Sequence, residues 1–126
     1  MKAINIVELA VPYIGQTLED SEDLIELARP MLNTALQEVL GTENSIRKQA
    51  GREELAEAPY LEKTDLSEDV PYDPALTRRA LPYWLAYRFL LEDDQGARAQ
   101  LYYNEYVNAV KEAQKMISTE VEDVYA

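Results

Sequence analysis

The segment 73–94, DPALTRRALPYWLAYRFLLEDD, constrains the fold more than any other part of the chain. It opens with Asp73 and Pro74, which are typical of the cap and the first position of a helix. The residues that follow are apolar or aromatic on nearly every face, so they overfill the stripe of an ordinary amphipathic helix. Two or more neighbouring elements, from this chain or from another copy, must therefore cover this helix.

The first half of the chain carries two helical repeats. Residues 3–14 have apolar residues at helical spacing, and Pro12 strains or ends that helix. A longer repeat follows over residues 20–41 and contains Pro30. Because the apolar stripe continues across Pro30, we expect one kinked helix rather than two pieces. Gly41 either ends this helix or bends it before a polar segment that adds a turn or two.

The second half pairs the apolar helix with a tyrosine-rich one. After a short turn, residues 95–118 repeat alanine and tyrosine at helical spacing. A short connection between helices of similar length predicts that they lie antiparallel. Pro82 frees a backbone carbonyl near Arg78, and another group must satisfy that carbonyl.

Two acidic segments lack helical periodicity. In the loop at 50–73, the residues from 53 onward include eight acidic side chains and one basic side chain. Isolated apolar residues, such as Tyr60 and Val70, lie among them. Loops of this length are usually functional or partly disordered. The last residues, 119–126, are acidic with apolar residues interleaved: Val121, Val124 and Tyr125. We expect both segments to be mobile in the isolated protein and to become ordered on assembly.

Together these patterns predict an all-α protein. We expect a small bundle of about four helices in a single domain over residues 1–118. The acidic loop at 50–73 lies between the second and third helices, and residues 119–126 form an extended, flexible tail.

Composition argues against an enzyme. The chain has no cysteine and no histidine, which excludes disulfides, the usual zinc sites, and catalysis by a thiolate or an imidazole. No glycine-rich phosphate loop is present, and the acidic clusters are better explained as helix caps than as ligands of a calcium loop. We therefore predict no catalytic residue, cofactor, metal or small-molecule substrate. A carboxylate–metal hydrolase is the remaining enzymatic alternative.

The charge of the chain limits its partners. Twenty-four acidic residues against twelve basic ones give a net charge of −12, which repels phosphates and anionic lipids. The longest apolar run is also shorter than the roughly 18 residues of a membrane span. We expect a soluble, unexported protein that neither enters a membrane nor clamps nucleic acid.

Three arginines stand out in this acidic chain. Arg78 and Arg79 lie at the start of the apolar helix, and Arg88 interrupts its apolar run. Ion pairs within the chain or between subunits explain all three. A sharper hypothesis is that Arg88 meets an acidic residue of a neighbouring subunit.

The order of these features resembles small neck proteins of tailed bacteriophages and prophages, namely the head-to-tail connector, adaptor or head-completion proteins. The similarity spans roughly residues 20–125. Its most specific pieces are VPYD, then ALPYWLAYRFLLEDD, and then the tyrosine-rich helix.

The resemblance implies a structural virion protein without chemistry of its own. Its copies would form a ring below the portal protein, extend the DNA channel and dock tail-side neck proteins, with DNA only as passing cargo. The protein would reside in the virion neck, and in the host cytoplasm before assembly. Candidate interface residues are Arg78, Arg79, Arg88, Tyr60, Val70, Val121, Val124 and Tyr125. The alternative is a small cytoplasmic acidic helical module or regulator that binds a basic protein.

Overall fold

The computed structural model describes the backbone of residues 1–125 and the side chains of residues 1–115. The described residues form five α-helices, a 3-10 turn and a π turn. In chain order these are α1 (Ala3–Ala10), the 3-10 turn (Val11–Ile14), α2 (Glu22–Glu38), α3 (Leu40–Gln49), the π turn (Leu76–Ala80), α4 (Leu81–Glu92) and α5 (Gly96–Tyr125). Within this part of the chain, strand-like pairing is limited to one bridge between Lys2 and Asp69. The predicted all-α class is confirmed.

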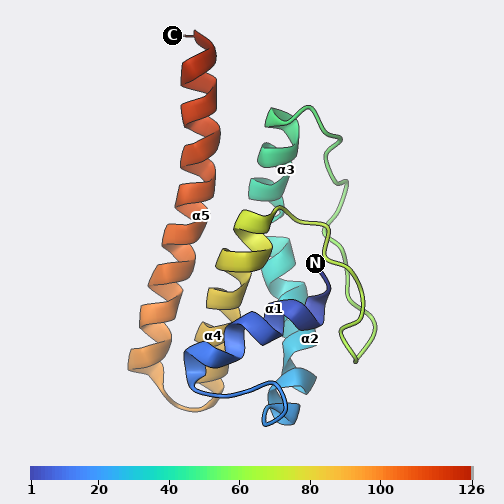
Figure 1. Ribbon diagram of the computed structural model, residues 1–126, viewed down its shortest axis with the longest axis vertical. Helices are drawn as coiled ribbons and strands as arrows, with labels where there is room; N and C mark the ends of the chain where they lie inside the picture. Colours follow the sequence, from blue (N-terminus) through green and yellow to red (C-terminus); the bar gives the residue numbers. More distant parts are fainter. Residues whose placement is uncertain (126) are drawn as a thin grey trace.

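The apolar helix α4 is the axis of the core. It contacts α1, α2 and α5, and Figure 1 shows it in the middle of the molecule with α1 crossing in front. Seven of its side chains are buried: Leu81, Pro82, Trp84, Leu85, Ala86, Phe89 and Leu90. The other helices of the same chain therefore bury most of the apolar surface of α4.

The segment before α4 adapts to a proline. The backbone N–H of Ala75 donates to Asp73 Oδ1 at 2.9 Å, so Asp73 caps this helix as predicted. The N–H of Leu81 donates to the carbonyl of Leu76, five residues back, which is the spacing of a π turn. Because Pro82 has no N–H to donate, the wider turn before it lets the helix continue.

Helix α5 runs antiparallel to α4, as predicted, after a turn in which Asp94 has a positive φ of 55°. It continues to Tyr125, so the expected extended tail at 119–126 is helical as far as that residue. No proline or glycine follows Gly96, so nothing in the backbone stops the helix. The side chains of Val121, Val124 and Tyr125 lie outside the described residues. No helix in the described part of the chain is long and apolar enough to cross a bilayer.

The predicted second helix is two helices, which corrects the count from about four to five. Pro30 lies inside α2 without ending it. The break falls at Val39, where φ is −99° and ψ is 7°. Gly41 lies within α3, because the buried neighbours Thr42 and Glu43 hold this segment and outweigh the roughly 1 kcal/mol that a glycine costs a helix.

The N-terminal segment is shorter as an α-helix than its periodicity predicts. Helix α1 ends at Ala10, and residues Val11–Ile14 form a 3-10 turn that contains Pro12. Gly15 follows with a φ of 75°, a left-handed conformation that favours glycine. Pro12 therefore ends the α-helix, which was one of the two predicted outcomes.

Candidate functional site

Two asparagines fasten the acidic loop at 50–73 to the helices. Asn33 of α2 donates to the carbonyl of Leu61 at 3.1 Å and accepts from its N–H at 2.8 Å. Asn44 of α3 makes the same pair of hydrogen bonds with Leu55, at 2.9 and 2.7 Å. Each amide satisfies both backbone groups of one loop residue, as a neighbouring strand would.

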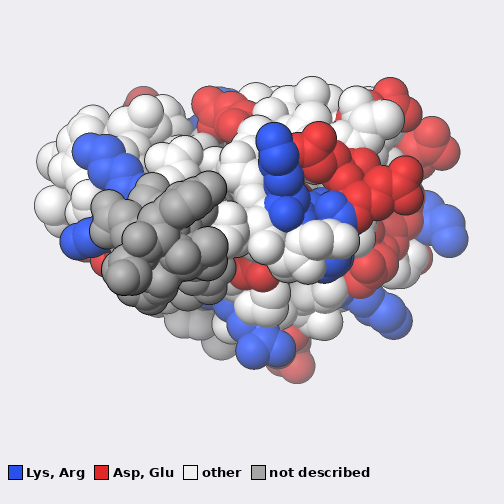
Figure 2. Space-filling view, turned by 90° about the horizontal axis from the view of Figure 1, so that it is seen from above, with Lys and Arg blue, Asp and Glu red and all other residues white. Residues whose placement is uncertain are grey.

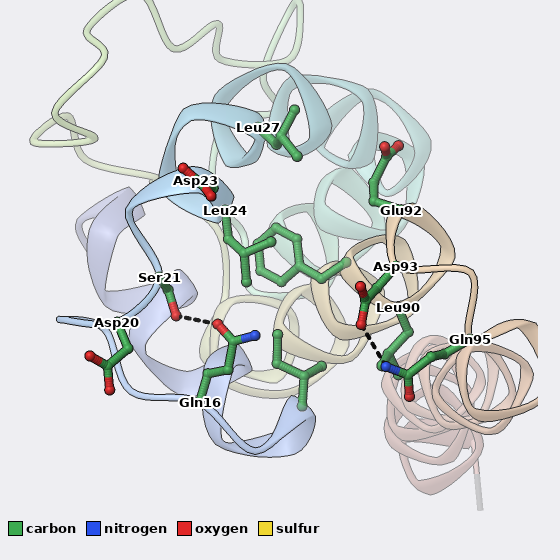
Figure 3. Close-up of a pocket in the computed structure, with 12 residues that line it drawn as sticks. Gln16, Asp20, Ser21, Asp23, Leu24, Leu27, Leu90, Glu92, Asp93 and Gln95 are labelled. Carbon is green, nitrogen blue, oxygen red and sulfur yellow. Dashed lines mark hydrogen bonds between the residues drawn. The ribbon is translucent and has the colours of Figure 1, made fainter.

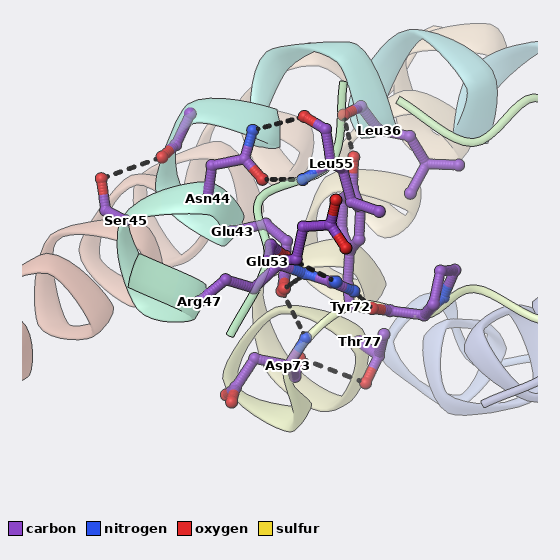
Figure 4. A network of polar contacts seen from close by, with 12 residues as sticks. Leu36, Glu43, Asn44, Ser45, Arg47, Glu53, Leu55, Tyr72, Asp73 and Thr77 are labelled. Atoms are coloured by element: carbon purple, nitrogen blue, oxygen red, sulfur yellow. Dashed lines mark hydrogen bonds and ion pairs between the residues drawn. The ribbon is translucent and has the colours of Figure 1, made fainter. Parts of the chain in front are cut away.

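A buried ion pair ties down both ends of this loop (Figure 4). Glu43 is completely buried, and its Oε2 accepts from Nε of Arg47 at 2.7 Å. Its Oε1 accepts from the N–H of Asp73 at 2.6 Å. Arg47 also donates to the carbonyls of Pro71 and Glu53, at 2.6 and 3.3 Å. One charge pair therefore joins α3, the start of the loop and the segment that leads into the apolar helix.

These contacts correct two expectations about the loop. Val70 is completely buried, and its N–H donates to the carbonyl of Met1 at 2.7 Å, so its side chain packs within its own chain and is not presented for contact. Leu61 and Leu66 are also buried. The loop is thus packed within the single chain, rather than waiting for assembly to order it. The physical reason is that side-chain amides and one ion pair supply the hydrogen bonds that its irregular backbone lacks.

Tyr72 adds a buried hydrogen bond to this network. Its hydroxyl donates to the carbonyl of Leu36 at 2.6 Å. Burial, together with the negative charge of Glu43, raises the pKa of Tyr72 from 10.0 to about 12. The neutral phenol is therefore the form that this site stabilises.

We expect the free energy of unfolding to fall as the pH rises above about 10. The unfolded chain ionises Tyr72 near pH 10.0, whereas the folded chain holds the proton until about pH 12. The neutral Tyr72 therefore contributes its full stabilisation below pH 10.0, and this stabilisation is lost as the pH rises through about 12. Urea denaturation between about pH 9 and pH 12 measures the slope. Tyr72→Phe should flatten it, and Tyr60→Phe is the matched control. An unchanged slope in Tyr72→Phe would contradict this account.

Tyr60 stands out on the outer side of the loop. Its side chain is 63% exposed, whereas its neighbour Leu61 is buried against the body. Glu62, on the other side of Leu61 in the sequence, is exposed as well. Tyr60 therefore keeps its place as a candidate contact residue.

The two arginines that precede α4 have different environments. Arg79 pairs with Glu112 of α5, and this hydrogen bond lowers the pKa of Glu112 below its ordinary value. The pair lies within one chain, which is the local alternative that the sequence left open. Arg78 is exposed and makes no ion pair among the described residues.

Arg88 packs on an aromatic side chain of its own helix, within a group that we call the Arg88 patch and define as Trp84, Tyr87, Arg88, Leu91 and Tyr103. The guanidinium carbon of Arg88 is 5.5 Å from the ring centroid of Trp84. Ring centroids of Trp84 and Tyr87 are 6.4 Å apart, and those of Tyr87 and Tyr103 are 5.0 Å apart. Leu91 is 41% exposed and Tyr103 is 38% exposed. The patch thus combines a half-buried cation with accessible apolar groups.

A second group of tyrosines closes the seam between α4, α5 and the 3-10 turn. The rings of Tyr13, Tyr83 and Tyr102 have centroids 5.1 to 6.3 Å apart, and the hydroxyl of Tyr102 donates to the carbonyl of Tyr13 at 2.9 Å. Tyr106 is buried, and its hydroxyl donates to Glu38 at 3.3 Å. These tyrosines join elements that lie far apart in the sequence.

An open pocket of about 420 Å³ lies at the end of the molecule where α4 turns into α5 (Figure 3). Its rim carries Asp20, Asp23, Glu92 and Asp93. Its apolar lining includes Leu24, Leu27, Phe89 and Leu90. Sequence reasoning assigned these acids to caps and turns, and no local signal could show that two segments so far apart share one rim.

The outer surface of the loop is strongly acidic. Figure 2 shows acidic side chains gathered at the loop side of the upper end of the molecule, with basic side chains among them. Exposed acids of this segment include Glu53, Glu54, Glu57, Glu62 and Asp65. In the described part of the chain, no group of three or more acidic, histidine or cysteine side chains is placed to hold a metal ion.

Comparisons with protein-family models, with curated proteins and with solved structures found no match.

Proposed function

We propose that this protein is a structural subunit of the neck of a tailed phage or prophage. Its copies form a ring at the head–tail junction, extend the DNA channel of the portal protein and dock tail components. The order and spacing of the sequence features support this proposal, and so does a helical body built around α4. The protein acts by binding and has no chemistry of its own.

The observation that carries the proposal is the length of α5. This helix has 30 residues, and its C-terminal end rises beyond the end of α3 in Figure 1. The sequence of that end alternates apolar and acidic residues. A helix end that extends beyond the rest of the helical bundle offers a surface for another subunit or for the portal protein.

The charge of the chain fits a channel through which DNA passes. The net charge is −12, and acidic side chains gather on the surface at the loop. Repulsion of the phosphate backbone removes the electrostatic attraction that drives non-specific DNA binding. DNA could then slide past a ring of such subunits without adhering to it.

Deletion of residues 119–126 tests the role of the helix end. We expect a nearly unchanged melting temperature, because Figure 1 places this end beyond α3, and complete loss of docking to the portal protein of the same genome. Circular dichroism measures the melting, and co-purification with the portal measures docking. The control replaces 119–126 with the same residues in scrambled order, which keeps the length and the charge. Normal docking of the truncated chain, or a large loss of stability, would contradict the proposed role.

Electron microscopy and mass measurement test the assembly itself. We expect rings of the purified protein at high concentration or on the isolated portal. A protein that stays monomeric in both experiments would overturn the neck assignment.

One observation favours the second candidate function, an acidic module that binds a basic protein. The pocket of Figure 3 combines an apolar lining with four carboxylates on its rim, which suits the aliphatic stem and the cationic head of a lysine or arginine. Under this alternative the monomer itself binds a basic partner, and the affinity falls steeply with added salt.

A further inference from the structure

The side chain of Arg88 is incompletely satisfied within its own chain. Its Nε is buried without a hydrogen-bond partner, the one such side-chain atom among the described residues. Acids outnumber bases two to one, yet no described acid pairs with Arg88. The ring of Trp84 holds the guanidinium in place by a cation–π contact. The Arg88 patch thus presents a positioned cation next to exposed apolar groups.

The acidic loop carries a complementary surface, which we call the loop tip and define as Tyr60 and Glu62. Both side chains are exposed, whereas Leu61 between them is buried and held by Asn33. The loop tip therefore offers an exposed aromatic ring and an exposed carboxylate two residues apart. A carboxylate accepts hydrogen bonds from an arginine, and an aromatic ring packs against an apolar surface.

The two surfaces are carried by different elements, the loop tip by the loop at 50–73 and the Arg88 patch by α4 and α5. Figure 1 shows the loop on one side and α5, which carries Tyr103 of the Arg88 patch, on the opposite side. A contact between such surfaces joins copies head to tail, and repeated head-to-tail contacts close into a ring when the rotation between copies allows it.

The geometry points to a contact in which the loop tip of one copy docks on the Arg88 patch of the next. Glu62 accepts hydrogen bonds from the guanidinium of Arg88, and the ring of Tyr60 packs on Leu91 and Tyr103. A partly desolvated pair of this kind, surrounded by aromatic groups, is typical of the residues that dominate binding energy. The inference rests on the proposed ring, since it names the contact that would build it.

Charge reversal tests this contact in solution. Sedimentation velocity over a range of concentrations measures self-association of the wild type, of Glu62→Arg and of Arg88→Glu. We expect each single variant to associate about tenfold more weakly or worse, and the double variant to recover part of the loss. An equal mixture of the single variants should associate again by alternation, because both contacts between unlike copies pair a positive side chain with a negative one. Glu57→Arg is the matched control and should associate as the wild type does.

Covalent trapping tests the same contact independently. The chain has no cysteine, so Tyr60→Cys combined with Leu91→Cys introduces one thiol on each surface. Under mild oxidation, alone and on the portal protein, we expect a ladder of cross-linked multimers. Each single cysteine variant should give no species larger than a dimer. Circular dichroism checks the fold of Arg88→Glu; should that variant misfold, the exposed Glu62→Arg and the cysteine pair carry the test.

The outcomes separate this contact from the proposed function. Rings in the electron microscope with no cross-linking and normal assembly of Glu62→Arg would overturn the contact and leave the neck function standing. Cross-linked multimers without rings or portal docking would support the contact and overturn the neck function. A wild type that neither assembles nor cross-links would overturn both.

Discussion

Leu85→Asp is expected to abolish the native fold. Leu85 lies in the middle of α4 and is completely buried among the side chains of the core. An unpaired carboxylate at such a position costs several kcal/mol, on the order of 4 or more, which is a large part of the stability of a small domain. Far-UV circular dichroism and size-exclusion chromatography should show loss of cooperative melting, with unfolding or aggregation.

The matched control is Leu101→Asp. Leu101 lies on α5 and is 64% exposed, so the same substitution there should change the free energy of unfolding by no more than about 0.5 kcal/mol. If Leu85→Asp melted cooperatively at the wild-type temperature, α4 would not be the axis of the core.

Glu43→Gln should release the acidic loop. The substitution removes the charge that neutralises Arg47, although it preserves the size of the side chain. Breaking a buried ion pair by removing one partner costs about 3 kcal/mol, because the remaining charge stays poorly solvated. We expect a lower urea midpoint and faster amide hydrogen exchange around Pro71 and Asp73, which this network holds.

Glu112→Gln is the control for Glu43→Gln. It removes the negative partner of Arg79, but that pair is exposed on the surface, where water screens the charges. Stability should change little. Equal losses of unfolding free energy in the two variants would mean that burial does not determine how strongly the Glu43–Arg47 pair stabilises the fold. Unchanged exchange around Pro71 in Glu43→Gln would mean that other contacts hold the loop.

Elements with strong periodicity were predictable from the sequence. The apolar segment at 73–94 contains a buried helix capped by Asp73, and the helix after it runs antiparallel, because both features depend on local spacing and on a short turn. Helix ends were harder to predict. Residues 119–125 continue α5 although their composition is that of a tail, and α3 includes Gly41 although glycine often ends a helix.

The candidate site was predictable only in part. Arg88 and Tyr60 stand out in the sequence, as a cation in an apolar run and as an aromatic residue among acids, and in the structure Tyr60 is exposed and Arg88 is partly buried. Val70 has similar sequence surroundings but is buried. The difference arises because Val70 packs against the N-terminal residues, far away in the sequence. The acidic pocket was missed because its two halves meet only in space.

The sequence by itself determined the helical class, the central place of the apolar helix and the acidic character of the surface. Each of these follows from residue spacing or from summed charge, which are local or additive properties. The tertiary structure alone decided that Asn33, Asn44 and Glu43 hold the loop, and that Arg88 rests on Trp84 with its Nε unsatisfied. Those features depend on which distant groups meet in a water-poor interior, where hydrogen bonds and charges gain or lose most of their free energy.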